Sequence, residues 1–341
     1  MRLRDYVVRR LFLSIPVIIG VLAITFVLAY VVGDPLSLYV DERTPRSAYD
    51  AIRRLHGLDQ PIYIQFFLYL RNLFTGNWGY STTARMDVIP TIQRYFPATI
   101  ELSIVAMIIA VVVGIPLGII SATRKDQLVD HVTRVVALAG VSMPIFWFAL
   151  MLKYLFYYQF FVWGLPFLPE GGRYNYIYLH YTPITNFILV DSLITGNVVL
   201  FFDALIHFVM PSICLGYIFL AVITRMMRSS MLEVLKEDYI TLARSKGLKE
   251  RVVIYRHALR NAMIPTVTVI GLGFGGLITG AVLTETIFSW PGLGRWAVAS
   301  ILTNDIPSIN AFTILVAIIF VTANLIVDLI YATLDPRIRY G

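Results

Sequence analysis

The residues best suited to bind another molecule form one basic stretch, residues 228–265, between two long apolar segments. Its cations include Arg244, Lys246, Lys249, Arg251, Arg256 and Arg260. Apolar residues recur there every three or four positions, which is helical spacing. They are Leu232, Leu235, Tyr239 and Leu242, then Leu248, Val252, Tyr255 and Leu259. Cationic and apolar side chains on the same helices predict non-covalent docking of a soluble partner.

Gly247 separates the two apolar stripes. Glycine tolerates the left-handed backbone that ends a helix, and Lys246 before it suits the negative end of a helix dipole. The stretch is therefore predicted to be helix, turn, helix. A basic loop that only neutralises lipid head groups would explain the excess of Arg and Lys, but not the paired apolar pattern.

Catalytic motifs are absent from the sequence. It contains no GxxxxGK[ST] phosphate-binding loop, no HExxH zinc pair and no GxSxG nucleophile motif. Its histidines, His56, His131, His180, His207 and His257, are scattered, and Cys214 is its single cysteine. The sequence thus predicts a chain that is not an enzyme and that binds no metal or cofactor of its own.

The composition of the chain indicates which kind of structure positions the basic stretch. The chain has 341 residues, of which 58% are hydrophobic and 14% charged, and a mean hydropathy of +0.74. These values are typical of an all-α integral membrane protein. A net charge of +7 is then explained by basic flanks of membrane helices, and not by nucleic acid binding.

A membrane-crossing helix needs about 20 mainly apolar residues, which predicts six spans. They are Leu11–Val32, Ile100–Ala122, Val135–Val162, Phe208–Met227, Ile264–Phe288 and Ile309–Ala332. The first is too long for a signal peptide and is expected to be retained. Residues 61–74 (PIYIQFFLYLRNLF) predict an amphipathic helix on the outer membrane face, with or without a partner.

Basic residues flank alternate ends of the spans. They include Arg9, Arg10, Arg124, Lys125, Arg134, Arg337 and Arg339. The positive-inside rule places these residues, both termini and residues 228–265 in the cytoplasm. We therefore divide the chain into a cytoplasmic N-terminus with the first span (1–32), an extracellular segment (33–98) and a core with the other five spans (99–341).

The stretch DYITLARSKGLKERVVIYRHALRNAMIP resembles the coupling (EAA) loop of ABC importer permeases in its peptide-transporter form. Further matches, in order, are GDP (33–35), GLDQP (57–61), GNWGYS (76–81), PLG (116–118), SMP (142–144), TETIFSWPGLG (284–294) and the tail LDPRIRYG. Along nearly its whole length the chain resembles the first of the two membrane subunits of dipeptide and oligopeptide permeases. Thr241 replaces the usual glutamate of the general loop, and Asn77 an aspartate.

This resemblance implies the fold of a type I ABC importer and four kinds of neighbour. They are a second homologous permease, two ATPases that hold ATP and Mg, an extracellular binding protein and membrane lipid. The coupling residues that it implies are Tyr239, Ala243, Lys246, Gly247, Leu248, Arg256, His257, Arg260 and Asn261. Ala243 and Gly247 would allow close packing on the ATPase, while the polar residues would contact it or cap helix ends internally.

Polar residues inside membrane spans are costly and so are candidates for a translocation path. The candidates are Glu101, Lys153, Asn324 and Asp328. Each candidate also has a structural alternative. Glu101 could be solvated at the outer interface, Lys153 could extend its ammonium group to the interface, and Asn324 with Asp328 could interact as an i, i+4 pair on one helix. Gly275 and Gly276, in GLGFGGLITG, would line the path or allow helices to pack closely.

The resemblance implies half of the translocation path of an ATP-driven importer of di- and oligopeptides, with oligosaccharides or nickel chelates as alternative substrates. A carrier or channel that needs no ATPase is the alternative from another class. Such carriers are often built from internal repeats, and no repeat is evident in this chain.

Overall fold

The computed structural model describes residues 3–32, 36, 45–165, 168–177 and 179–334, and it is almost entirely helical. Its two longest helices, α4 (Val88–Thr123) and α9 (Val198–Val234), pack against each other at the centre. At 1.5 Å per residue each is more than about 50 Å long, which exceeds the roughly 30 Å of a bilayer's hydrocarbon core. Both helices are therefore longer than the hydrocarbon core is thick.

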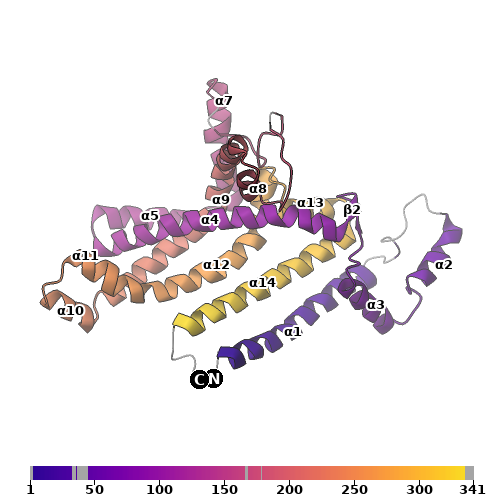
Figure 1. The fold of residues 1–341 in the computed structure, drawn as a ribbon, viewed down its shortest axis with the longest axis horizontal. Coiled ribbons are helices and arrows are strands. Elements are labelled where there is room, and N and C mark those ends of the chain that lie inside the picture. The colour runs from indigo at the N-terminus through magenta and orange to yellow at the C-terminus, as the bar shows by residue number, and fades with distance from the viewer. Residues whose placement is uncertain (1–2, 33–35, 37–44, 166–167, 178, 335–341) are drawn as a thin grey trace.

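Further helices lie beside this pair and beyond it (Figure 1). They are α1 (Leu3–Val27) with η1 (Leu28–Val32), α2 (Arg46–Leu55), α3 (Ile62–Phe74), α5 (Leu128–Ser142), α6 (Ile145–Lys153) with η3 (Tyr154–Gln159) and α7 (Phe160–Val162), α8 (Ile188–Ile194), α10 (Asp238–Ser245), α11 (Glu250–Val252) with η4 (Val253–Ala258), α12 (Leu259–Ile287), α13 (Leu293–Leu302) and α14 (Ile306–Leu334). A short antiparallel ladder, β1 (Tyr80–Ser81) with β2 (Met86–Asp87), is a small exception to the all-α prediction.

Six segments among the described residues are long and apolar enough to cross a membrane. They are Phe12–Val31, Val88–Thr123, Ile145–Val162, Val198–Val234, Glu250–Ile287 and Ile306–Ile326. The predicted number of spans is confirmed. Helix α4 begins at Val88, 12 residues before the predicted start of the second span at Ile100, so the helix is longer than the predicted span.

The predicted single span from Val135 to Val162 is wrong. The helix breaks between α5 and α6, where Met143 is extended, with φ −84° and ψ 125°. Met143 precedes Pro144, and a proline ring disfavours helical backbone in the residue before it. Only the second part, Ile145–Val162, is long and apolar enough to cross a membrane.

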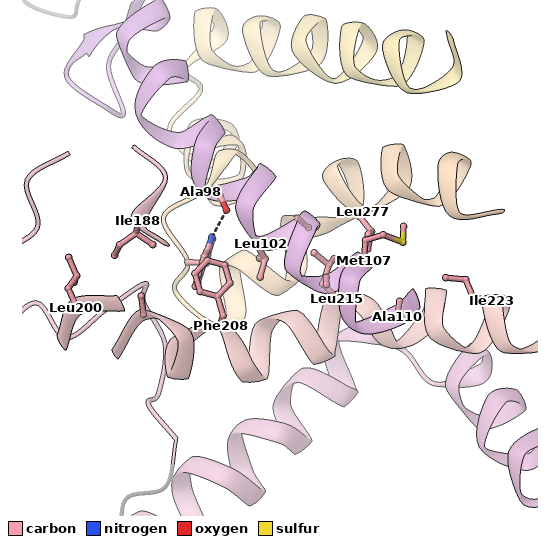
Figure 2. Packing of buried hydrophobic residues seen from close by; sticks show 14 residues of the cluster. Ala98, Leu102, Met107, Ala110, Ile188, Leu200, Phe208, Leu215, Ile223 and Leu277 are labelled. Atoms are coloured by element: carbon pink, nitrogen blue, oxygen red, sulfur yellow. Dashed lines mark hydrogen bonds between the residues drawn. The ribbon is translucent and has the colours of Figure 1, made fainter. Parts of the chain in front are cut away.

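Small residues allow α4 and α9 to lie close together. A Cβ atom on Gly118 would lie 2.6 Å from Cβ of Met227, and one on Gly216 would lie 2.7 Å from the Ala106 carbonyl oxygen. Around this contact Leu102, Phe208 and neighbouring apolar side chains form the largest buried cluster (Figure 2). The pair thus forms the centre of the fold, with α12 packed on both helices, α14 on α12 and α1 on α14.

The ends of the bundle differ (Figure 1). We call one the α10 end, because α10 and α11 lie there beside the end of α4 and the start of α5. We call the other the α13 end, where α13 and the β ladder lie. The helix predicted at residues 61–74 is confirmed as α3, and it lies against α1, where Tyr69 Oη and Thr25 Oγ1 are 3.0 Å apart.

Candidate functional site

The segment from residue 228 to residue 265 is folded as the sequence predicts. Helix α9 ends at Val234, α10 follows, and Gly247 turns the chain with a left-handed φ of 74°. After the turn α11, η4 and α12 are continuous in sequence, from Glu250 to Ile287. The helix, turn, helix prediction is confirmed, and its second helix extends into the membrane bundle.

Helix α10 has one buried and one exposed face. Ile240 is completely buried and packs with Met227 and Met231 of α9 and with Val253 and Ala262 on the other side of the turn. Four large apolar residues of the segment are exposed, and we call them the coupling face: Tyr239 and Leu242 on α10, Leu248 after the turn and Tyr255 in η4. Leu242 is 56% exposed. The four belong to the predicted stripes, whereas Leu232, Leu235 and Leu259 of the same stripes pack against the internal cluster.

Ala243 is positioned differently from what was predicted for it. Its side chain belongs to the internal cluster around Ile240 and is only 7% exposed. A small residue is required there because α10 packs closely against its own chain. Ala243 therefore supports the coupling face from behind.

Polar contacts hold α10 to the following helices. Asn261 Nδ2 donates a hydrogen bond to Tyr239 Oη over 2.7 Å, and Arg244 forms an ion pair of 2.7 Å with Glu250. The hydrogen bond to Glu250 raises the pKa of Arg244. Asn261 thus makes an internal contact, which is one of the two roles foreseen for it.

The other predicted polar residues of the segment are more accessible. Lys246, Arg256 and Arg260 are exposed, while His257 is partly buried. They add positive charge to the coupling segment, which also has the exposed carboxylates of Glu237, Asp238 and Glu250. A partner with apolar residues inside an acidic rim would complement this surface.

An ion pair missed in the sequence links α5 to α9 at the same end. Asp130 is fully buried and accepts two hydrogen bonds from Arg228, of 2.7 and 2.8 Å. Ser121 Oγ donates a third over 2.5 Å, and the backbone NH of Asp126 a fourth over 3.0 Å. The bond from Arg228 is the main cause that lowers the pKa of Asp130. The sequence could have indicated this ion pair only by the presence of a carboxylate and an arginine at the margins of two apolar runs.

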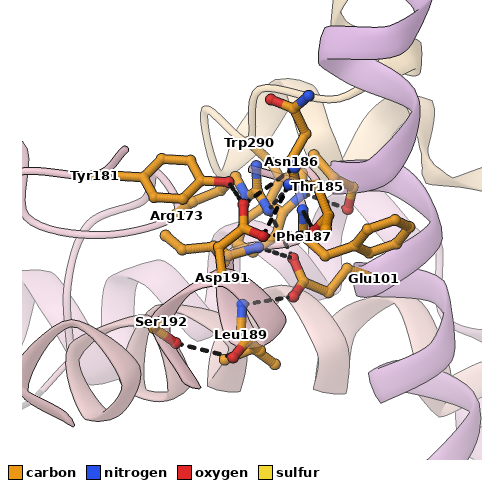
Figure 3. Close-up of polar contacts among 12 residues, drawn as sticks. Glu101, Arg173, Tyr181, Thr185, Asn186, Phe187, Leu189, Asp191, Ser192 and Trp290 are labelled. Carbon is orange, nitrogen blue, oxygen red and sulfur yellow. Dashed lines mark hydrogen bonds and ion pairs between the residues drawn. The ribbon is translucent and has the colours of Figure 1, made fainter. Parts of the chain in front are cut away.

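Glu101, a predicted path residue, lies instead in a buried ion pair at the α13 side of α4 (Figure 3). It is 5% exposed, and its carboxylate is 2.6 Å from Arg173 Nη2. The backbone NH groups of Ile188 and Leu189 also donate to it, over 3.2 and 2.8 Å. Its partners therefore attach the segment before α9 to α4, which is a structural role that the sequence did not indicate.

A second carboxylate organises the same segment. Asp191 accepts hydrogen bonds from Tyr181 Oη over 2.7 Å and from Thr185 Oγ1 over 2.6 Å. Backbone NH groups of residues 184 to 186 also donate to it (Figure 3). These bonds give residues 181–191 a fixed shape with little regular secondary structure.

The other predicted path residues contact different neighbours. Lys153 Nζ lies 3.3 Å from Glu170 and 3.2 Å from the Ile287 carbonyl oxygen. A Cβ atom on Gly275 would lie 3.1 Å from Ala323 of α14, and one on Gly276 would lie 3.3 Å from Phe219 of α9. These glycines occupy helix contacts, which favours the packing interpretation.

Two path candidates lie on α14. Asn324 is partly buried, and the side chain of Asp328 lies outside the described residues. Within the part of the chain that is described, no group of three His, Cys, Asp or Glu residues could hold a metal ion.

Comparisons with known proteins agree with this architecture. Residues 114–340 match the family described as binding-protein-dependent transport system inner membrane component, and residues 3–103 match the N-terminal region of such components. Together the two matches cover most of the chain.

Three relatives match almost end to end. The di/tripeptide transport system permease protein DppB of Pseudomonas aeruginosa is 45% identical over 98% of this chain and 99% of its own length. The dipeptide transport system permease protein DppB of Escherichia coli is 44% identical over the same shares. The oligopeptide transport system permease protein AppB of Bacillus subtilis is 35% identical, again over 98% and 99%.

These matches exceed what a shared membrane architecture alone would produce, and they extend over both the spans and the coupling segment. The chain therefore belongs to the family of binding-protein-dependent transport system inner membrane components, as a non-catalytic, multi-pass permease subunit related to the dipeptide and oligopeptide permeases.

Proposed function

We propose that this permease forms half of the path of an ATP-driven importer of dipeptides and oligopeptides, and that partner ATPases bind its coupling face. The observation that carries this proposal is the exposure of Tyr239, Leu242, Leu248 and Tyr255 on a segment that extends into α12. Apolar side chains grouped on a surface outside the lipid have little reason to be exposed unless a partner covers them. The substrate class comes from the related permeases.

Force applied to the coupling face has a continuous route through the chain. The contacts of Asn261 and Arg244 hold α10 to the start of the helical run 250–287. Near its other end, Glu285 accepts hydrogen bonds from Thr99 Oγ1 over 2.5 Å and from the Arg295 NH over 3.0 Å. Closure of the ATPases would therefore tilt α12 as a lever and displace α4 and α13 at the α13 end.

The orientation is part of this proposal. We infer that the α10 end and both termini lie in the cytoplasm, since Arg124, Lys125 and Arg134 lie at that end together with the basic coupling segment. The α13 end would then face the binding protein. The division into residues 1–32, 33–98 and 99–341 is proposed on the same basis, with ATP and Mg held by the partners.

Recovery of partners tests the coupling face directly. The tagged chain should co-purify with a second permease and with ATPase subunits from gently solubilised membranes. Leu242→Asp should remove the ATPases because it places a charge in an apolar contact. Leu302→Asp is the control, since Leu302 is also exposed but belongs to α13 at the opposite end.

Uptake by the reconstituted complex tests the substrate and the energy source. Labelled dipeptide should accumulate in proteoliposomes only when ATP is supplied, and excess unlabelled peptide should compete. Uptake of an oligosaccharide or a nickel chelate in place of peptide would refute the substrate class. Uptake without ATP would favour the independent carrier.

A further inference from the structure

A groove between α5 and α9 at the α10 end takes no part in the coupling face. Its volume is about 380 Å³. One half is lined by Ser121, Thr133, Arg134, Arg225, Arg228 and Ser229. The other half is lined by Ala137, Leu138, Val141 and Ala221, and Thr224 lies between the two halves. Polar and apolar groups are therefore separated along the groove.

The separation follows the helix axes. Asp130 contacts Arg228, and a Cβ atom on Gly140 would lie 3.2 Å from Cβ of Ala221, so the two helices run in opposite directions. From Arg228 to Ala221 the groove covers about 10 Å along α9, at 1.5 Å per residue. Its cationic half lies next to the end of α4, and its apolar half lies deeper in the bundle.

The charge of the cationic half is not fully compensated. Asp130 is the nearest carboxylate to Arg228 and Arg134, with contacts of 2.7 and 3.6 Å. Arg134 also contacts the ring of His131 over 2.7 Å. Arg225 is exposed and forms no ion pair with another described residue. Arg228 and Arg134 thus share one buried carboxylate, and Arg225 adds a further positive charge to the groove.

We propose that this groove binds an anionic phospholipid, with its phosphate between Arg225 and Arg134 and the start of an acyl chain along Val141 and Ala221. Basic pockets between membrane helices on the cytoplasmic side suit anionic head groups. A free phosphate ion would leave the apolar half empty, whereas a phospholipid matches both halves and the length. Because α9 leads into α10, the lipid would also stabilise the base of the coupling segment.

The test is lipid binding to the purified complex, measured by native mass spectrometry during titration with phosphatidylglycerol. Arg225→Gln should weaken binding about fivefold, the effect expected from one basic residue near an anionic lipid. Arg124→Gln is the matched control, because Arg124 is exposed at the same end but does not line the groove. It should bind phosphatidylglycerol as the unmodified chain does.

Other lipids and ions distinguish the occupants. Phosphatidylcholine should bind much more weakly, and inorganic phosphate should not compete at millimolar concentration. Equal binding of both lipids, equal affinity in Arg225→Gln, or full competition by phosphate would each overturn the proposal. So would a cross-link from the groove to the second permease in lipid-replete membranes. Because lipid binding is measured without transport, a failure of this proposal can be distinguished from a failure of the proposed import function.

Discussion

Substitution of Gly247 tests whether the turn beside the coupling face transmits force. Gly247 has a φ of 74°, and a Cβ atom there would meet nothing within 4 Å. Alanine would therefore add backbone strain alone, about 1–2 kcal/mol for an L-residue in this region. That strain should raise the fraction of molecules with a distorted turn by about fivefold or more.

A graded series makes the prediction specific. Gly247→Asn should have the smallest effect, because asparagine tolerates left-handed backbone, and Gly247→Ala a larger one. Gly247→Pro should have the largest effect. Its ring fixes φ near −65° and removes the hydrogen bond of 2.9 Å from the Gly247 NH to the Arg244 carbonyl oxygen. The assay is the number of peptides transported per ATP hydrolysed in proteoliposomes.

Gly196 supplies the control for this series. It has a φ of 66° and equally open surroundings, but it lies between α8 and α9, away from the coupling segment. Gly196→Ala should cost similar stability and leave the transport ratio unchanged. If Gly247→Ala and Gly196→Ala gave the same ratio, the reasoning about the turn would be refuted.

Three further predictions follow from the buried contacts. Glu101→Ala should destabilise the complex by about 3–5 kcal/mol, because Arg173 stays buried without its partner. In thermal unfolding, the double variant Glu101→Ala/Arg173→Met should recover part of this loss. Equal losses in the single and double variants would argue against the ion pair. The bonds to Asp130 lower its pKa in the folded protein, so its stabilisation is complete above the unfolded pKa of about 4 and is lost as pH falls below it. The advantage of the unmodified chain over Asp130→Asn in unfolding temperature should accordingly shrink below about pH 4, and a constant gap would contradict this. Ala243→Leu should overpack the internal cluster and cost about 1–3 kcal/mol, while Ala243→Ser should cost less; unchanged unfolding of Ala243→Leu would show that this face of α10 is open.

The membrane spans and the coupling segment could be predicted because their patterns are local. Apolar runs require helices in lipid, and the repeat of Tyr239, Leu242, Leu248 and Tyr255 around Gly247 reflects a single short segment. The break at Pro144 was also local, but a long apolar run concealed it. Helix boundaries such as that at Val88 depend on contacts made elsewhere in the fold.

The roles of buried polar residues could not be predicted in the same way. Glu101 and Arg173 are 72 positions apart in the sequence, and Asp130 and Arg228 are 98 apart. Burial of a charged side chain costs free energy, so the sequence identifies such residues as unusual. Whether the residue lines a substrate path or forms an ion pair depends on the residue that the fold places beside it. For Gly275 and Gly276, the facing residues on α14 and α9 likewise decide the role.

The most direct test of the account is site-specific photo-cross-linking from two neighbouring positions of α10 in native membranes. Leu242 is 56% exposed, whereas Ile240 is completely buried. A photoreactive residue at position 242 is predicted to cross-link to an ATPase subunit, and one at position 240 only within its own chain. Cross-links from position 242 to lipid or to its own chain alone would contradict the proposal that this face couples the permease to ATP hydrolysis.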